Sequence, residues 1–332
     1  MKKLNEIFAC KDFIIFDNDI FTININNYFL VNNVIVNNGL CSIRGYYENN
    51  VVIFEEKNFE TFIYNNKSQL IKHIPEYALI IRKHIVNNKF IVAINNGINI
   101  QRAIFDIKNF EILKLFNDFG FLNLKLVIGN FFVSSNNSDI GLFNFENENI
   151  WKINIKEILE DETVYLHNEI LEINNKLFFI ISGQEKGHFL YCLNIETGTV
   201  LYKYEGLFGF LTKDDKYIYS QKFENILCKI NTETGELEQW NVNDLLIENG
   251  FESIADHRTT SLNEIVYFTQ TIGDNKAKFG LLDTKKKELI FKYNFEPKNG
   301  GIGKIEVNET RVYIHTQDNT LHIFENQKIN EV

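Results

Sequence analysis

The chain has 332 residues, of which 45% are hydrophobic and 14% aromatic, including 30 phenylalanines. This content is ample for a folded core. Lys and Arg total 34 against 44 Asp and Glu, which gives a formal net charge of −10. A nucleic acid is therefore not expected as a partner, because a phosphate-binding surface needs a cationic footprint and the sequence contains no Lys/Arg-rich run.

The first ten residues imitate a lipoprotein signal, because Lys2 and Lys3 precede Cys10. Asn5 and Glu6 interrupt the apolar stretch that such a signal needs, and the segment is too short to reach a signal peptidase. No later run approaches the roughly 18 apolar residues of a membrane helix. We therefore expect a cytoplasmic protein that does not bind a membrane.

Short apolar or alternating runs follow one another along the chain, at lengths that suit strands better than helices. One such set is formed by residues 176–181, 189–195 and 200–204. Residues 12–25 form further predicted strands near the N-terminus. Three segments could instead form a helical turn in a connection between strands: Lys67–Tyr77, Lys156–Thr163 and Asn241–Gly250.

A polar residue followed by a tight turn and a second apolar run recurs seven times. These polar residues are Glu55, Asp106, Asn144, Asn194, Asn231, Asp283 and Glu325. Their spacings are 51, 38, 50, 37, 52 and 42 residues, with a mean of 45. In two of the turns, Gly198 and Gly235 can adopt a positive φ that lets two strands fold back on each other. A degraded repeat of this length, built from short strands, is typical of a β-propeller.

The repeat predicts an all-β fold, a seven-bladed β-propeller of four-stranded antiparallel blades. The approximate blades are 28–66, 79–118, 121–156, 166–206, 210–243, 251–296 and 302–327. The last blade has little room for an outer strand, so we expect an N-terminal strand within 12–25 to join it and close the ring. No Pro/Ser-rich linker divides the chain, and we expect residues 1–332 to form a single domain and a monomer.

The segment Leu190–Tyr202, with the sequence LYCLNIETGTVLY, resembles the repeat of WD40-like and pyrroloquinoline-quinone-like (PQQ-like) propellers. In that repeat a short strand, an Asp, a Thr-Gly turn and an aromatic residue follow one another. This chain has Asn194 at the position of the Asp and Tyr202 at the position of a Trp, and it has no adjacent cysteine pair. The resemblance implies the fold, and it implies no cofactor and no catalytic residue.

No catalytic, cofactor-binding or metal-binding motif stands out in the sequence. The seven histidines include no pair at metal-ligand spacing. Asp256 and His257 are adjacent, but neighbouring strand residues point to opposite faces, so we favour a charged turn over a catalytic pair. The cysteines Cys10, Cys41, Cys192 and Cys228 include no C-x-x-C pair and are expected to be free core thiols. We predict no catalytic residue, no cofactor and no metal ligand, and favour a protein that is not an enzyme.

Acidic residues are densest in the connection Lys156–Thr163. In a propeller such a connection lies on the same face as the turns between the second and third strands of the blades. The predicted partner-binding residues are Glu157, Glu160, Asp161, Glu162, Glu185, Glu224 and Asp274. A solvated loop without a partner is the alternative interpretation, because exposed acidic residues are common and contribute little singly.

These observations favour a non-catalytic propeller that presents one rigid face to another protein. The acidic balance favours, within that class, a bacterial immunity-type protein that binds and neutralises a basic toxin or nuclease. One alternative is an enzyme or small-ligand binder of the hydrolase or lyase type that uses the central opening of the propeller. The other is an assembly scaffold, which predicts a large exposed apolar patch.

Overall fold

The computed structural model describes residues 1–16, 18–47, 50–86, 88–95, 100–116, 123–136, 138–254, 258–271 and 277–326. This part of the chain contains eight four-stranded sheets, in which neighbouring strands are antiparallel. The predicted all-β fold of four-stranded antiparallel blades is therefore confirmed. The chain divides into two compact units, Ala9–Asn154 and Met1–Phe8 with Ile155–Val332. That the whole chain folds as one domain stays a prediction.

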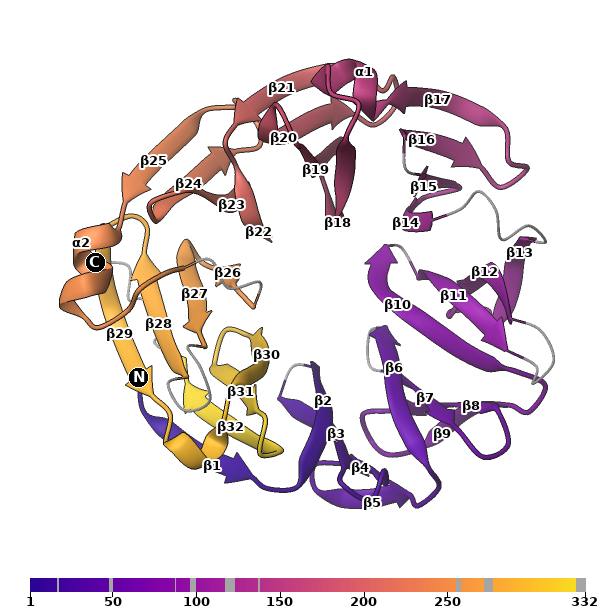
Figure 1. The fold of residues 1–332 in the computed structure, drawn as a ribbon. Helices are drawn as coiled ribbons and strands as arrows, with labels where there is room; N and C mark the ends of the chain where they lie inside the picture. Colours follow the sequence, from indigo (N-terminus) through magenta and orange to yellow (C-terminus); the bar gives the residue numbers. More distant parts are fainter. Residues whose placement is uncertain are drawn as a thin grey trace. The chain divides into compact units, whose positions relative to one another are not determined.

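The unit Ala9–Asn154 holds four sheets, each formed by four strands consecutive in the sequence. They are β2 (Cys10–Phe16), β3 (Asp19–Asn24), β4 (Phe29–Val31), β5 (Val34–Asn37); β6 (Cys41–Tyr47), β7 (Asn50–Glu55), β8 (Glu60–Asn65), β9 (Leu70–Ile74); β10 (Ala78–Val86), β11 (Lys89–Asn95), β12 (Ile100–Asp106), β13 (Glu111–Phe116); and β14 (Asn123–Ile128), β15 (Phe131–Ser135), β16 (Asp139–Asn144), β17 (Asn149–Asn154). The first strands β2, β6, β10 and β14 contact each other from sheet to sheet (Figure 1).

The second unit repeats this arrangement in the remaining four sheets. They are β18 (Val164–Ile173), β19 (Lys176–Gly183), β20 (Gly187–Asn194), β21 (Val200–Glu205); β22 (Phe208–Asp214), β23 (Tyr217–Lys222), β24 (Ile226–Asn231), β25 (Leu237–Asn241); β26 (Thr260–Leu262), β27 (Ile265–Gln270), β28 (Lys278–Asp283), β29 (Glu288–Asn294); and β30 (Ile302–Val307), β31 (Arg311–Thr316), β32 (Thr320–Glu325), β1 (Lys3–Ile7). Here too, the first strands β18, β22, β26 and β30 contact each other in sequence order. The sheets of each unit are the blades described below.

The short helices lie in connections between blades. They are α1 (Ile155–Leu159), α2 (Asn243–Glu248) and a 3₁₀ turn at Pro297–Asn299. Two of the three segments predicted to form a helical turn therefore do so, but Lys67–Tyr77 is a wrong prediction because it contains β9, which pairs with β8. Within the described part of the chain, each helix is too short and too polar to cross a bilayer.

The predicted number of seven blades is wrong, because the structure has eight. The predicted blade 28–66 is divided between two sheets: β4 and β5 complete the first, and β6, β7 and β8 begin the second. Residues 12–25 are not an added strand of the last blade but contribute to β2 and β3 of the first. The error came from assigning this N-terminal blade to the end of the chain.

One repeat residue, Glu55, misplaced the bounds of the predicted blade 28–66, because it forms the same kind of turn as the others. Its carboxylate accepts hydrogen bonds from the backbone N–H groups of Lys57 (3.1 Å) and Asn58 (2.9 Å). However, Glu55 ends the second strand of its blade, not the third. The third strand ends at Asn65, whose side-chain oxygen accepts hydrogen bonds from two backbone N–H groups of the next turn at 3.0 Å each.

The outer strand of the last blade comes from the N-terminus, as predicted, although it is Lys3–Ile7. β1 pairs with β32, and Glu6 lies opposite His322 in the register. Lys3 Nζ lies 2.5 Å from Glu6 Oε1. The pairing covers the edge of β32, which would otherwise expose unpaired backbone groups.

The repeated polar residue fixes the turn between the third and fourth strands. The Oδ1 of Asn231 accepts hydrogen bonds from the N–H groups of Glu233 (2.9 Å) and Thr234 (3.2 Å), and Gly235 then adopts a φ of 76°. The corresponding turn in the next blade starts at Asp283 and places Lys287 at a φ of 57°. A residue with a Cβ is strained in this left-handed region, whereas glycine is not.

Lys287→Gly is therefore expected to raise the free energy of unfolding by about 0.5 kcal/mol. Relief of the left-handed strain exceeds the greater entropy of glycine in the unfolded chain. Lys287→Ala is the matched control, since it keeps the strain and removes the exposed ion pair with Glu238, which contributes little. Urea titrations of the three proteins test this, and a Lys287→Gly variant less stable than Lys287→Ala would contradict it.

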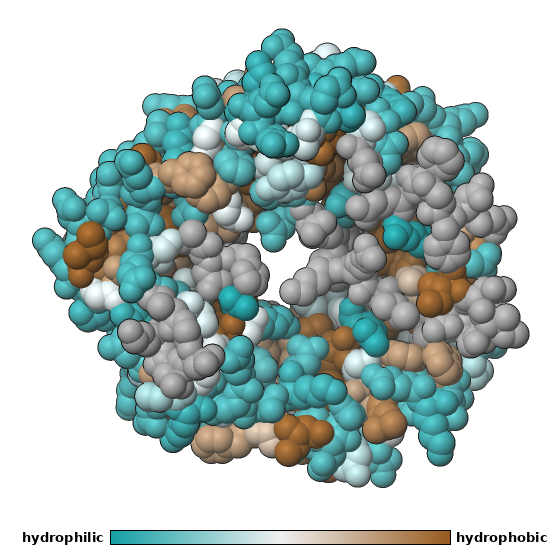
Figure 2. Space-filling model, in the orientation of Figure 1, coloured by the Kyte–Doolittle hydropathy of each residue, from teal (hydrophilic) through white to brown (hydrophobic). Residues whose placement is uncertain are grey.

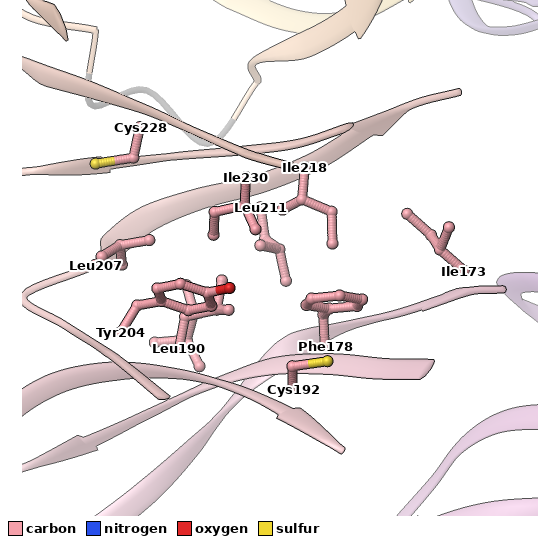
Figure 3. Packing of buried hydrophobic residues seen from close by; sticks show 11 residues of the cluster. Ile173, Phe178, Leu190, Cys192, Tyr204, Leu207, Leu211, Ile218, Cys228 and Ile230 are labelled. Atoms are coloured by element: carbon pink, nitrogen blue, oxygen red, sulfur yellow. The ribbon is translucent and has the colours of Figure 1, made fainter. Parts of the chain in front are cut away.

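Adjacent blades are held together by apolar side chains. Figure 3 shows the cluster between β18–β21 and β22–β25, in which Phe178, Leu190 and Cys192 face residues of the next blade such as Ile218 and Cys228. All four cysteines of the chain are free and buried, as predicted. Burial raises the pKa of Cys192 to about 12 and that of Cys228 to about 11, so these thiols stay protonated and act as small apolar side chains.

Candidate functional site

Two exposed aromatic side chains mark a candidate site on the blades β18–β21 and β22–β25. Tyr165 is 55% exposed and Phe223 is 63% exposed. In the unit formed by Met1–Phe8 and Ile155–Val332, the face seen in Figure 2 is mostly hydrophilic, with apolar side chains in small groups. Large apolar side chains that stay in contact with water are informative when they gather with others. Here they belong to a row of rings that crosses from one blade to the next.

The row consists of five side chains, which we call the aromatic surface: Tyr165, His167, His188, Phe208 and Phe223. Their ring centroids are separated by 4.8 Å (Tyr165–His167), 6.4 Å (His167–His188), 5.2 Å (His188–Phe208) and 4.2 Å (Phe208–Phe223). Each separation is within the range of direct or nearly direct ring contact. The surface therefore forms one continuous set of rings from two blades.

Strand register explains why these rings meet. In the first blade, Tyr165 lies opposite Ser182, and Ser182 lies opposite His188. Directly opposed residues on antiparallel strands share one face of the sheet. In the second blade, Phe208 begins the first strand, and Phe223 follows the end of the second strand, in its turn to the third.

A buried serine holds the two histidines. Ser182 Oγ lies 2.7 Å from His167 Nε2 and 2.5 Å from His188 Nδ1, and the residue is 1% exposed. A single hydroxyl can donate to one ring nitrogen and accept from the N–H of the other, so it fixes both rings together. Burial lowers the pKa of His188; burial, and then the nearby His188, lower that of His167. Both rings are therefore neutral at pH 7.

This arrangement does not form a catalytic triad within the described residues. A serine nucleophile needs a base that a third group orients, and neither His167 nor His188 has a hydrogen-bonded carboxylate there. Ser182 is also almost fully covered. The serine and the two histidines act chemically as a rigid support for the exposed rings.

The predicted acidic residues have different environments. Asp161 is only 6% exposed, and its carboxylate accepts hydrogen bonds from the N–H groups of Thr163, Glu185 and Lys186 at 2.8, 2.8 and 3.1 Å. These hydrogen bonds, first that from Thr163, hold the pKa of Asp161 below its usual value. Asp161 thus shapes the turn between β19 and β20.

Three other predicted residues are near Asp161 in sequence, in the same connection. Glu160 lies 3.6 Å from Lys186 Nζ, and Glu162 lies 3.1 Å from Lys156 Nζ. Glu157 is exposed on α1. Ion pairing to lysines of the chain reduces the negative charge that Glu160 and Glu162 can offer to a partner.

Two predicted residues are close in sequence to the aromatic surface. Glu224 is exposed and follows Phe223 directly, and Glu185 is exposed in the turn that leads to His188. Both carboxylates are therefore close in sequence to residues of the aromatic surface, and Lys222 precedes Phe223 directly. Asp274, and the pair Asp256 and His257, fall outside the residues that the structure describes.

The aromatic residues themselves were not predicted. Tyr165 and His167 alternate with apolar neighbours like ordinary strand residues, and Phe208 and Phe223 are among 30 phenylalanines. The available signal was weak: aromatic or histidine side chains lie at strand ends of two successive repeats. Only the structure shows that they meet.

The whole chain is similar in fold to solved β-propellers. No protein-family model matches the sequence, and no curated protein is similar to it. The fold is that of a β-propeller, with eight four-stranded blades in the part of the chain that the structure describes.

Three solved structures show this similarity, each at 11% sequence identity. BamB from Moraxella catarrhalis matches with a TM-score of 0.56 over 98% of this chain and 99% of its own. Sqt1 from Saccharomyces cerevisiae gives 0.60 over 99% and 100%, and the computationally designed protein Ika8 gives 0.62 over 98% of each chain. At this identity the likeness establishes the fold alone.

Proposed function

We propose that this chain is a non-catalytic protein-binding β-propeller that uses the aromatic surface. The observation that carries the proposal is the exposure of Tyr165 and Phe223 on a support fixed by Ser182. Binding sites between proteins favour aromatic side chains at the centre, because a rigid ring buries a large area at a small entropic cost. The neutral histidines between the rings add contact area without a charge that must be desolvated.

The finer proposal is that the partner is basic, as expected for an immunity-type protein that neutralises a bacterial toxin or nuclease. The net charge of −10 and the exposed carboxylates of Glu185 and Glu224 support it. A negative rim around an apolar centre accelerates the encounter with a cationic protein. The four free cysteines are in keeping with a cytoplasmic location, where thiols stay reduced.

The hypotheses of an enzyme at the central opening and of an assembly scaffold stay predictions. Within the described residues, no group of three or more His, Cys, Asp or Glu side chains could hold a metal ion. The aromatic surface favours recognition of a protein over both.

The test is affinity capture from the native cell, with variants of the bait. Phe223→Ala is expected to weaken retention of a specific protein about tenfold, since a central aromatic side chain contributes more than 1 kcal/mol to typical interfaces. Phe8→Ala is the matched control, because Phe8 is 70% exposed and lies outside the aromatic surface. A partner lost equally from both variants, or retained by both, would refute the proposed site. Turnover of a small molecule by the purified protein would refute the proposed function.

A further inference from the structure

An arginine in the unit Ala9–Asn154 has an Nε atom without a hydrogen-bond partner among the described residues. Arg44 lies on β6, at a point where the register with β7 shifts between Ile43 and Gly45. Such a bulge turns a side chain in a new direction and is frequent beside functional sites. The guanidinium carbon of Arg44 lies 5.0 Å from the centre of the Phe54 ring.

Ser42 lies next to this pair. It is directly opposite Phe54 in the register, so the two side chains share one face of the sheet. Ser42, Arg44 and Phe54 therefore form a compact group of a hydroxyl, a guanidinium and an aromatic ring. The strand that carries the first two is a first strand, in contact with β2 and β10 (Figure 1).

The polar atoms of this group have unmet hydrogen bonds. Ser42 Oγ and Arg44 Nε are both buried, and neither has a hydrogen-bond partner among the described residues. Buried polar groups of proteins nearly always have a partner, so two such atoms on one strand need an explanation. Burial also lowers the pKa of Arg44, against the opposing effects of Glu56 and Asp12.

Two carboxylates favour the charged form of Arg44. They belong to Glu56 and Asp12, while the Arg44 Nε atom itself has no hydrogen-bond partner among the residues that the structure describes. These carboxylates offset part of the positive charge. A ligand with one negative charge is therefore better suited to the site than one with two.

The geometry of the group selects a planar ligand. Phe54 lies against the guanidinium, and Nε on the edge of that group has no hydrogen-bond partner among the described residues. The Nε–H edge of arginine presents two parallel donors that match the two oxygens of a carboxylate. Ser42 Oγ adds a further donor beside them.

We propose that Ser42, Arg44 and Phe54 form a carboxylate-binding site. The ligand is a monoanion whose carboxylate forms two hydrogen bonds with the Arg44 edge and one with the Ser42 hydroxyl. The site belongs to the unit Ala9–Asn154 and does not depend on the function proposed for the aromatic surface.

The test is NMR of the arginine Nε–Hε groups, of which the full chain has five. The Arg44 resonance is assigned by its loss in Arg44→Lys. Sodium acetate is titrated at constant ionic strength against sodium chloride. Acetate is expected to move the Arg44 resonance along a saturable curve, whereas chloride is not expected to do so. The Arg311 resonance is the internal control.

Ser42→Ala leaves Arg44 in place and is expected to weaken acetate binding about tenfold. This is the usual effect of losing a hydrogen bond to a charged group.

Three results would overturn the proposal. The first is an Arg44 resonance that responds equally to acetate and chloride. The second is saturation by inorganic phosphate but not by acetate, which would assign a different ligand. The third is an Asp12→Asn or Glu56→Gln variant that shifts the Arg44 resonance as far as acetate does, without any added ligand, because Arg44 would then be paired within the chain.

Discussion

Replacing Gly235 with alanine is expected to lower the free energy of unfolding by about 3 kcal/mol. Gly235 has a φ of 76°, and left-handed backbone costs a residue with a Cβ about 1–2 kcal/mol. The added Cβ would also collide with the ring of Tyr202, which lies on the outer strand β21 of the preceding blade. Displacing a packed ring costs about 1–3 kcal/mol. Urea denaturation measures the sum of the backbone cost and the cost of displacing the Tyr202 ring.

Gly187→Ala separates the two contributions. Gly187 has a φ of 80°, but an added Cβ would meet no described atom within 4 Å, so only the backbone cost of about 1 kcal/mol remains. Removing the Tyr202 ring in Tyr202→Ala should cancel the steric part of the Gly235→Ala effect in a double-mutant cycle. Equal losses at Gly235 and Gly187, with no coupling to Tyr202, would contradict this packing between blades.

The second large effect is a loss of stability in mild acid through His322. This side chain is 0% exposed; its Nε2 lies 2.9 Å from Thr316 Oγ1 and its Nδ1 lies 2.9 Å from Glu6 Oε1, although the latter angle does not fit a hydrogen bond. Burial, and then the nearby Lys3, lower its pKa from 6.5 to about 4, against the weaker opposing effects of Glu6 and Asp318.

The lowered pKa of His322 determines how its contribution to the free energy of unfolding changes with pH. The folded state binds the proton less tightly than the unfolded state, so His322 contributes its full stability above pH 6.5 and loses it as the pH falls toward 4. Between pH 7 and pH 5 the loss from His322 is about 2 kcal/mol. The lowered pKa values of His167 and His188 act in the same direction.

Unfolding by urea at pH 7 and pH 5 tests this dependence. His322→Asn removes the titrating group and is expected to reduce the difference in unfolding free energy between the two pH values by about 2 kcal/mol. The pH range stays above the region in which most carboxylates become protonated. An unchanged difference in His322→Asn would show that this histidine is not the group responsible.

The sequence predicts the repeat best where the turn is encoded locally. Asn194, Asn231 and Asp283 each accept hydrogen bonds from the next backbone N–H groups, so residue type and position alone determine the turn. The first blade lacks this signal. Its third and fourth strands have three and four residues, and they are joined by Asn32 and Asn33, both at positive φ. Such a two-residue hairpin carries no repeat residue, so the blade was not counted.

The candidate site could not be predicted in the same way. His188 and Phe223 are 35 residues apart and meet because neighbouring blades pack together, a relation that leaves no local pattern. Asp161 has an acidic sequence context but is buried by hydrogen bonds to the N–H groups of Glu185 and Lys186, which are distant in sequence. Composition therefore located the acidic connection, but only tertiary structure distinguishes a structural carboxylate from an exposed one.

Photo-crosslinking at position 223 in the native cell tests the proposed protein-binding surface most directly. A photoreactive phenylalanine analogue in place of Phe223 is expected to form a covalent adduct with one specific polypeptide, and the same analogue in place of Phe8 is not. Tyr165→Ala is expected to reduce the yield of the adduct at position 223. No adduct at position 223, or the same adduct from both positions, would contradict the assignment of this surface as a site of protein binding.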